Sequence, residues 1–106
     1  MGKIERLNKQ IENLERDILI LEEKIELARE KMNSGAITRA EYHKAKMRFS
    51  AKIRALRAAV KRKQKARRDL EQKEKEKEEE KRKKLEEKLK KKKKKSSKEK
   101  KDIFGD

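Results

Sequence analysis

The feature that most constrains this chain is a helix stop followed at once by a helix start, within Met32–Tyr42. Gly35 has no Cβ, so it can adopt the left-handed backbone conformation that closes a helix C-terminus. Thr38 and Glu41 have the spacing of a capping box, in which each side chain caps the backbone amide of the other residue. These signals predict two helices joined by a tight turn at residues 33–38.

Apolar residues recur at steps of three and four on both sides of this turn, which is the spacing of a coiled-coil seam. The seam comprises Ile4, Leu7, Ile11, Leu14, Ile18, Leu21, Ile25, Ala28 and Met32, then Tyr42, Ala45, Phe49, Ile53, Leu56 and Val60. Folding the chain back about Gly35 places Ile18 against Ile53 and Ile11 against Val60. We therefore expect an all-α fold, an antiparallel two-helix coiled-coil hairpin over residues 1–68.

The seam loses its apolar partners at the open end of this hairpin. There Ile4 and Leu7 would face Arg67 and Lys63, whose aliphatic stems can cover them. A core of only two helices is thin, so we expect a bound partner or a second copy to complete it.

Beyond the hairpin, charged residues replace the apolar seam. Residues 69–89 mix Glu and Lys at three- and four-residue spacing, which predicts a solvated extension of the second helix. Six consecutive lysines then begin residues 90–106, and their mutual repulsion predicts a disordered lysine-rich C-terminal tail with an acidic and apolar terminus.

Composition argues against several classes of function. With no cysteine and one histidine, the chain has no disulfide, no thiol chemistry and no expected metal site. We identify no catalytic residue, no cofactor and no small-molecule substrate, and expect a protein that is not an enzyme. No apolar run approaches the roughly 20 residues that span a bilayer, and no signal-peptide core is present, so we expect a cytoplasmic protein without a membrane partner.

The basic charge is concentrated in two blocks. Residues 33–68 carry thirteen basic side chains and one acidic, and residues 88–101 carry ten lysines and one glutamate. The candidate nucleic-acid-binding residues are Lys44, Arg54, Arg57, Lys61, Arg62, Lys65 and Arg68 in the second helix, and Lys90, Lys91, Lys92, Lys93, Lys94 and Lys95 in the tail. Phosphate binding by these residues would be strong and salt-sensitive.

Other interpretations of the two basic blocks stay open. The helical block can be a solvated face, or a protein contact made through the interspersed alanines. The tail can be a solubilising end or can bind anionic lipid.

Sequence-specific reading of bases is not expected, because no asparagine follows Asn33 and aromatic residues for base stacking are few. Contacts to phosphate and duplex shape remain, which favours structured RNA over DNA. Our hypothesis is a non-catalytic RNA-binding protein associated with the ribosome or another ribonucleoprotein. The alternatives are a DNA-associated protein of the nucleoid, and a structural coiled-coil adaptor that self-associates or docks a protein partner.

Two further groups of apolar residues are candidate partner-binding residues. Leu19, Ile20 and Leu27 lie off the seam of the first helix and predict a homodimer or protein partner there. Ile103 and Phe104, in the terminal Asp-Ile-Phe-Gly-Asp, form either a docking peptide for a protein pocket or a disordered end.

The segment Gly35-Ala36-Ile37-Thr38-Arg39-Ala40-Glu41-Tyr42 resembles the Gly-x-Ile-Thr-x-x-Glu-aromatic turn of two-helix segments of the SHOCT type. This resemblance implies a hairpin and no particular function. A balanced helix that turns into a basic one is also similar in shape and charge to small two-helix proteins of the large ribosomal subunit.

Overall fold

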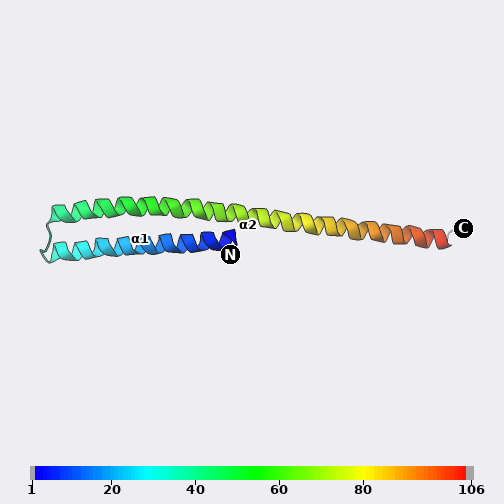
Figure 1. Ribbon diagram of the computed structural model, residues 1–106, viewed down its shortest axis with the longest axis horizontal. Helices are drawn as coiled ribbons and strands as arrows, with labels where there is room; N and C mark the ends of the chain where they lie inside the picture. Colours follow the sequence, from blue (N-terminus) through cyan, green and yellow to red (C-terminus); the bar gives the residue numbers. More distant parts are fainter. Residues whose placement is uncertain (1, 105–106) are drawn as a thin grey trace. The chain divides into compact units, whose positions relative to one another are not determined.

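The computed structural model consists of two long α-helices, α1 at Lys3–Asn33 and α2 at Arg39–Phe104 (Figure 1). It describes the backbone of residues 2–104 and the side chains of residues 2–91. No strand occurs in the described backbone, which confirms the all-helical prediction. The chain divides into two units, Met1–Leu70 and Glu71–Asp106, which we take separately.

The turn between the helices is closed by backbone hydrogen bonds around Gly35. Gly35 has a φ of 82°, and its amide donates to the carbonyl of Met32 at 3.1 Å. The amide of Ala36 donates to the carbonyl of Lys31 at 2.8 Å. Together these two bonds form a Schellman motif, which satisfies carbonyls that the end of α1 would leave without partners.

Helix α2 starts at the expected capping residues, with one difference. The Thr38 hydroxyl accepts from the amide of Glu41 at 3.1 Å, as the capping box requires. The Glu41 carboxylate accepts from that same hydroxyl at 3.3 Å and not, as expected, from the Thr38 amide. Since one half of the box is sufficient to cap a first-turn amide, α2 still begins at Arg39.

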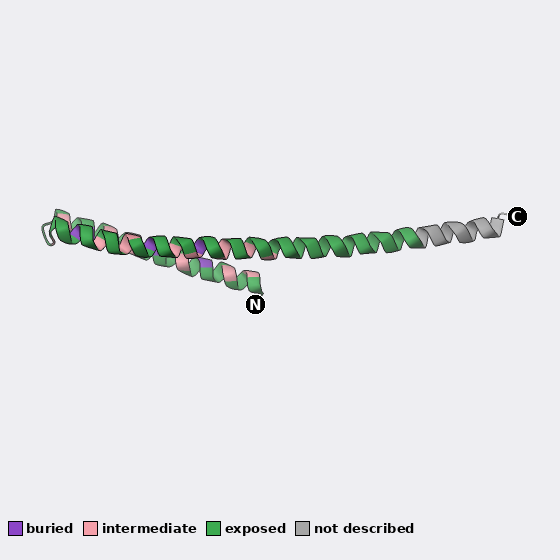
Figure 2. Cartoon of the chain, turned by 90° about the horizontal axis from the view of Figure 1, so that it is seen from above, coloured by how far each residue is buried: buried purple, intermediate pink, exposed green. Residues whose placement is uncertain are grey.

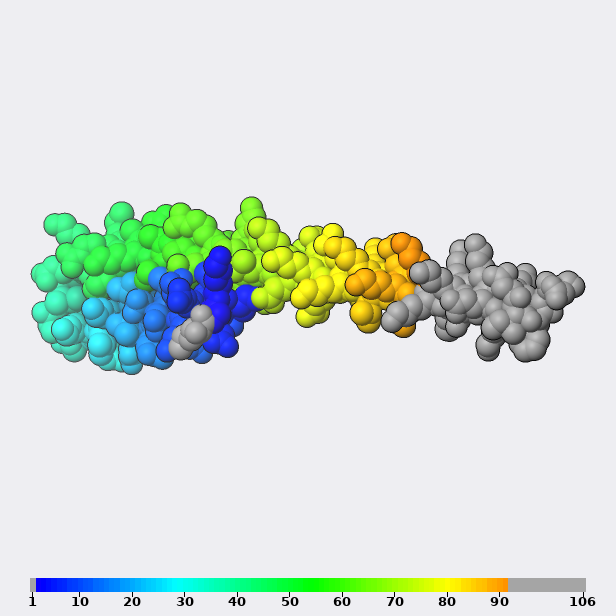
Figure 3. All heavy atoms as spheres, turned by 45° about the vertical axis from the view of Figure 1, so that its right-hand side comes forward, coloured from blue at the N-terminus to red at the C-terminus, as the bar shows by residue number. Residues whose placement is uncertain are grey.

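Within residues 1–70, α1 and the first part of α2 lie side by side, and we call this unit the helix pair (Figures 1 and 3). Ile11, Ile18, Ile53 and Val60 form a buried cluster, with Leu14, Leu21, Ile25 and Leu56 packed against it. The residues that we expected to face one another, Ile18 with Ile53 and Ile11 with Val60, thus share one cluster. Ala28 and Tyr42 are also buried.

The core of the helix pair is thin. Six hydrophobic side chains are buried, and in the described part of the chain none is less than 2% exposed. Buried residues therefore alternate with half-buried ones along both helices (Figure 2).

The second unit, beginning at Glu71, has no buried residue among its described side chains, those of residues 71–91 (Figure 2). Oppositely charged side chains alternate here, yet none of those between residues 71 and 91 pair within 4.0 Å. Their stabilising effect on the helix must act through solvent, and it is correspondingly small.

Helix α2 continues to Phe104, whereas the sequence predicted a helix end near Leu89 and an unfolded lysine tail. Lysine is a good helix former, and neither proline nor glycine interrupts residues 36–104. The side chains of Lys92, Lys93, Lys94, Lys95, Ile103 and Phe104 lie outside the described residues, so the roles predicted for them stay predictions.

Candidate nucleic-acid interface

The basic residues predicted on α2 within the helix pair are all exposed. They are Lys44, Arg54, Arg57, Lys61, Arg62, Lys65 and Arg68. Because buried Ile53 and Val60 mark the side of α2 that contacts α1, a helical wheel at 100° per residue places most of these cations on the opposite side. Arg57 and Arg68 lie at the edge.

Arg57 differs from the other six because it has a carboxylate partner. One of its guanidinium nitrogens lies 2.9 Å from Oε1 of Glu22 in α1, and the two side chains are 61% and 43% exposed. An ion pair at this exposure contributes little stability, but it lowers the charge that Arg57 offers to a ligand. Among residues 2–91, the other ion pair joins Arg29 to Glu26 within α1.

Lys63 and Arg67, which the sequence placed at the open end of the seam, each donate a hydrogen bond to a side chain of α1. Lys63 donates to the side-chain oxygen of Gln10 at 2.8 Å, and Arg67 donates to that of Asn8 at 2.8 Å. Both cations are half-buried, as are Ile4 and Leu7 of α1. Since amides are neutral, these contacts position Lys63 and Arg67 without reducing the positive charge of the helix pair.

Near the turn, cations also lie over the aromatic rings. Lys46 is 6.0 Å from the centre of the Tyr42 ring, while Lys24 and Arg48 are 6.0 and 5.9 Å from that of Phe49. Attraction to the ring face holds such groups weakly at exposed sites. With Tyr42 buried and Phe49 half-buried, neither ring offers a free face for stacking a nucleobase.

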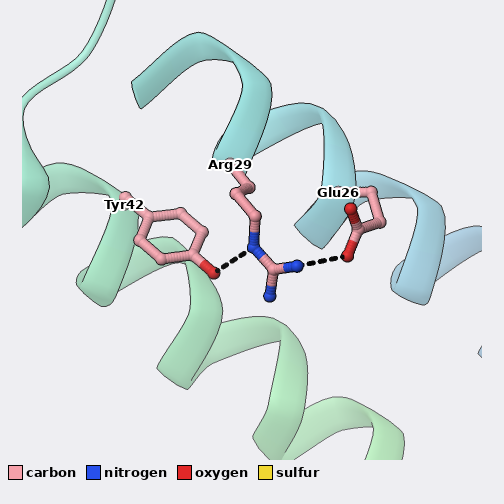
Figure 4. A network of polar contacts seen from close by, with 3 residues as sticks. All are labelled: Glu26, Arg29 and Tyr42. Atoms are coloured by element: carbon pink, nitrogen blue, oxygen red, sulfur yellow. Dashed lines mark hydrogen bonds and ion pairs between the residues drawn. The ribbon is translucent and has the colours of Figure 1, made fainter. Parts of the chain in front are cut away.

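Arg29 connects the two helices at the turn end of the helix pair (Figure 4). Its Nε donates to the Tyr42 hydroxyl at 3.2 Å and its terminal nitrogen donates to Glu26 at 3.0 Å. The hydrogen bond to Tyr42 raises the pKa of Arg29, and the charge of Glu26 raises it further. One donor of Arg29 is thus engaged by α2 and another by α1.

The apolar residues of α1 predicted to bind a partner, Leu19, Ile20 and Leu27, are exposed, but they do not form one surface. Ile20 and Leu27 line two shallow grooves between the helices, whereas Leu19 is not among the lining residues of either. Leu19 lies outside the grooves because consecutive residues of a helix, such as Leu19 and Ile20, point about 100° apart. Met47, at 74% exposed, is an apolar side chain on α2 that the prediction did not include.

The described residues contain no group of three or more histidine, cysteine or carboxylate side chains suited to a metal ion. In the same part of the chain, neither helix has a segment long and apolar enough to cross a membrane. Comparison of the sequence and structure with protein-family models, curated proteins and solved structures finds no match.

Proposed function

We propose that this chain is a non-catalytic, antiparallel coiled-coil hairpin that binds structured RNA through phosphate contacts along α2, in a cytoplasmic ribosome or ribonucleoprotein. The observation that carries this proposal is the uncompensated charge of residues 33–68. Of their thirteen basic side chains, only Arg57 has a carboxylate within 4.0 Å in the part of the chain whose side chains are described.

The arrangement of these cations suits a phosphate backbone. Arg54, Lys61 and Lys65 are exposed, and the small Ala51 and Ala58 lie on the same side of α2. Small side chains between the cations allow a sugar-phosphate strand to approach the helix closely. Each phosphate that a cation neutralises releases condensed counterions, which is the main source of affinity for such a surface.

Contacts to phosphate and groove shape, without base reading, favour structured RNA as the ligand. The buried or half-buried rings of Tyr42 and Phe49 leave little aromatic surface for a single strand. Double-stranded RNA is recognised mainly through its shape, its phosphates and its 2′-hydroxyls. Lys90 and Lys91 are exposed and would extend these contacts, together with the lysines that follow them.

A charge-matched pair of variants tests this proposal. Changing Arg54, Lys61, Arg62 and Lys65 to Gln removes four cations from α2, and changing Lys3, Arg6, Lys9 and Arg16 to Gln removes four exposed cations from α1. With a fluorescent RNA duplex, the α2 variant should reduce the slope of log affinity against log salt by about three to four, at roughly 0.9 per phosphate. The α1 variant should change that slope by less than about one. Equal losses in both variants would mean that net charge alone governs binding.

A structural adaptor that self-associates is the second candidate, and exposed Leu19 and Met47 favour it. Light scattering in the absence of nucleic acid separates the two functions, because an adaptor would form a stable oligomer whereas the RNA-binding protein needs none.

A DNA duplex of the same length, titrated in parallel, distinguishes the DNA-associated variant of the main proposal.

A further inference from the structure

Two shallow grooves lie on one side of the helix pair and meet at Lys24, which lines both. Their volumes are about 430 and 370 Å³. The apolar lining residues include Ile20, Leu21 and Leu56 in the first, and Leu27, Ala45 and Phe49 in the second. We call the two together the lateral groove.

The α1 wall of the lateral groove repeats every seven residues. Ile20 and Leu27, which are 45% and 53% exposed, are seven residues apart, as are Lys24 and Lys31. At 1.5 Å per residue, each pair is separated by about 10.5 Å along the same face of the helix. Apolar and cationic positions therefore alternate with the period of a coiled coil.

The α2 wall of the lateral groove contains small residues beside Phe49 and Leu56, and it carries another cation. It supplies the small Ala45 and Ala55, and between them Lys52. Small residues at these positions allow a third helix to approach the backbone of α2. Two carboxylates also line the lateral groove, Asp17 in the first groove and Glu41 in the second. Where the two grooves meet, the charged lining residue is Lys24.

We infer that the lateral groove binds an acidic amphipathic helix of a partner protein, which packs as a third helix on the helix pair. Its apolar residues, seven apart, would cover Ile20 and Leu27. Its carboxylates, with the same spacing, would reach Lys24 and Lys31. Along α1 the lining residues extend from Asp17 to Lys31, about 21 Å, which matches a helix of about fourteen residues.

The thin core of the helix pair supports a third helix. Six buried side chains, none of them below 2% exposed, leave apolar surface along both described helices. Covering Ile20 and Leu27 would remove further apolar area from water, which is the main driving force for packing an amphipathic helix into a groove.

The charge of the helix pair favours a different, acidic protein over a second copy as the occupant. Residues 1–70 carry twenty basic and ten acidic side chains. A two-fold dimer through the lateral groove would place the same lysine-lined surface on both sides of the interface. The exposed Leu85 and Leu89 of a second copy could also supply apolar side chains to the lateral groove. Residues 81–91 around them carry seven basic and two acidic side chains, however, so this segment would be repelled by the lysines of the groove.

Three synthetic peptides of about fourteen residues, each titrated into the full-length chain and followed by NMR, test the inference. The first has leucines and glutamates at the heptad spacing described above, the second replaces its glutamates by lysine, and the third replaces its leucines by serine. At about 150 mM salt, where surface charges are screened beyond about 8 Å, the first should bind about tenfold tighter than either control. The amide resonances of the chain that this peptide shifts should belong to residues 17–31 and 41–56.

A matched pair of variants in the chain locates the peptide. The double variant Ile20→Gln and Leu27→Gln should weaken binding of the first peptide about tenfold, the effect of losing about 1.4 kcal/mol. Leu19→Gln, at a position that is 64% exposed and lies outside the lateral groove, should change it by less than about twofold.

Several results would overturn the inference. The acidic peptide could fail to bind, bind no tighter than its serine control, or shift residues around Lys61 and Lys65 instead. Leu19→Gln could weaken binding as much as the double variant does. The chain alone could dimerise in a manner lost in the double variant, which would assign the lateral groove to a second copy. The inference does not depend on RNA binding, because these peptides contain no phosphate and the variants leave Arg54 and Lys61 in place.

Discussion

At the scale of single residues, the turn depends on Gly35. Its φ of 82° lies in the left-handed region, and a Cβ added there would meet no atom within 4 Å. Any penalty for alanine therefore comes from the backbone conformation and not from a clash.

Replacing Gly35 by Ala should destabilise the helix pair by about 1–2 kcal/mol, the cost of a left-handed conformation for a residue with a Cβ. Urea unfolding followed by circular dichroism measures this loss. Gly35→Asn should cost less, since asparagine tolerates this conformation. Gly2→Ala, at the N-cap of α1, should cost less than Gly35→Ala, because alanine adopts the φ of −69° without strain and only the N-cap preference for glycine is lost. A Gly35→Ala protein as stable as the parent would show that the turn does not need the left-handed residue.

Lys63 and Arg67 show a second residue-scale compromise, between stability and charge. They continue the apolar seam after Val60, yet each has a charged head that contacts only a neutral amide. Leucine at either position would bury more apolar surface against Ile4 and Leu7 of α1.

Lys63→Leu and Arg67→Leu should each raise the free energy of unfolding by about 0.5–1 kcal/mol, from partial burial of the new side chain. They should also weaken binding to duplex RNA, because each removes a cation. Lys61→Leu, at an exposed position, should weaken binding without a comparable gain in stability. If both seam variants lower the urea midpoint, the amide contacts of Lys63 and Arg67 contribute more than the proposed burial.

At the scale of the helices, the apolar seam determines how α1 and α2 pack. Its central residues, Ile18 and Ile53, are 9% and 6% exposed and belong to the same cluster. Both lie far from the turn in sequence, so their effect is separable from that of Gly35.

Ile18→Ala and Ile53→Ala should each destabilise the helix pair by about 2 kcal/mol or more, as truncation of buried isoleucines does. Since the two residues share one cluster, the loss in free energy of unfolding of the double variant should differ from the sum of the two single losses. Leu85→Ala, at a side chain 62% exposed, should leave the urea midpoint nearly unchanged. Strict additivity within about 0.3 kcal/mol would contradict contact between Ile18 and Ile53.

The start of α2 and the turn were predictable because capping signals are local. Gly35, Thr38 and Glu41 lie within seven residues, and the structure places their hydrogen bonds there. The far end of α2 was not predictable from repulsion among lysines alone. The helix propensity of those same lysines acts in the opposite direction, and α2 extends through them to Phe104.

The lateral groove was only partly accessible from sequence. The seven-residue spacing of Ile20 with Leu27, and of Lys24 with Lys31, was a detectable signal in α1. Placing Lys52 beside them needs the rotation and register of α2 against α1, which the apolar spacing defines only to within about a turn. For the same reason, the sequence did not predict that Lys63 and Arg67 would donate to Gln10 and Asn8.

At the scale of the whole molecule, the distribution of charge is the property on which the proposed function depends. A formal net charge of +16 in 106 residues is concentrated in two blocks, and the ion pairs among the described side chains compensate little of it. The acidic residues lie mainly in α1 and in residues 69–87, apart from both blocks. A chain with this distribution is suited to attract a polyanion.

The salt dependence of duplex RNA binding by the full-length chain tests this central claim most directly. If six to ten phosphates are contacted, affinity should fall by about 10³–10⁵ between 50 and 200 mM salt, with a linear log–log slope. Fluorescence anisotropy at several salt concentrations measures this slope. Undetectable binding at about 150 mM salt, or an affinity that stays constant across the range, would contradict the account.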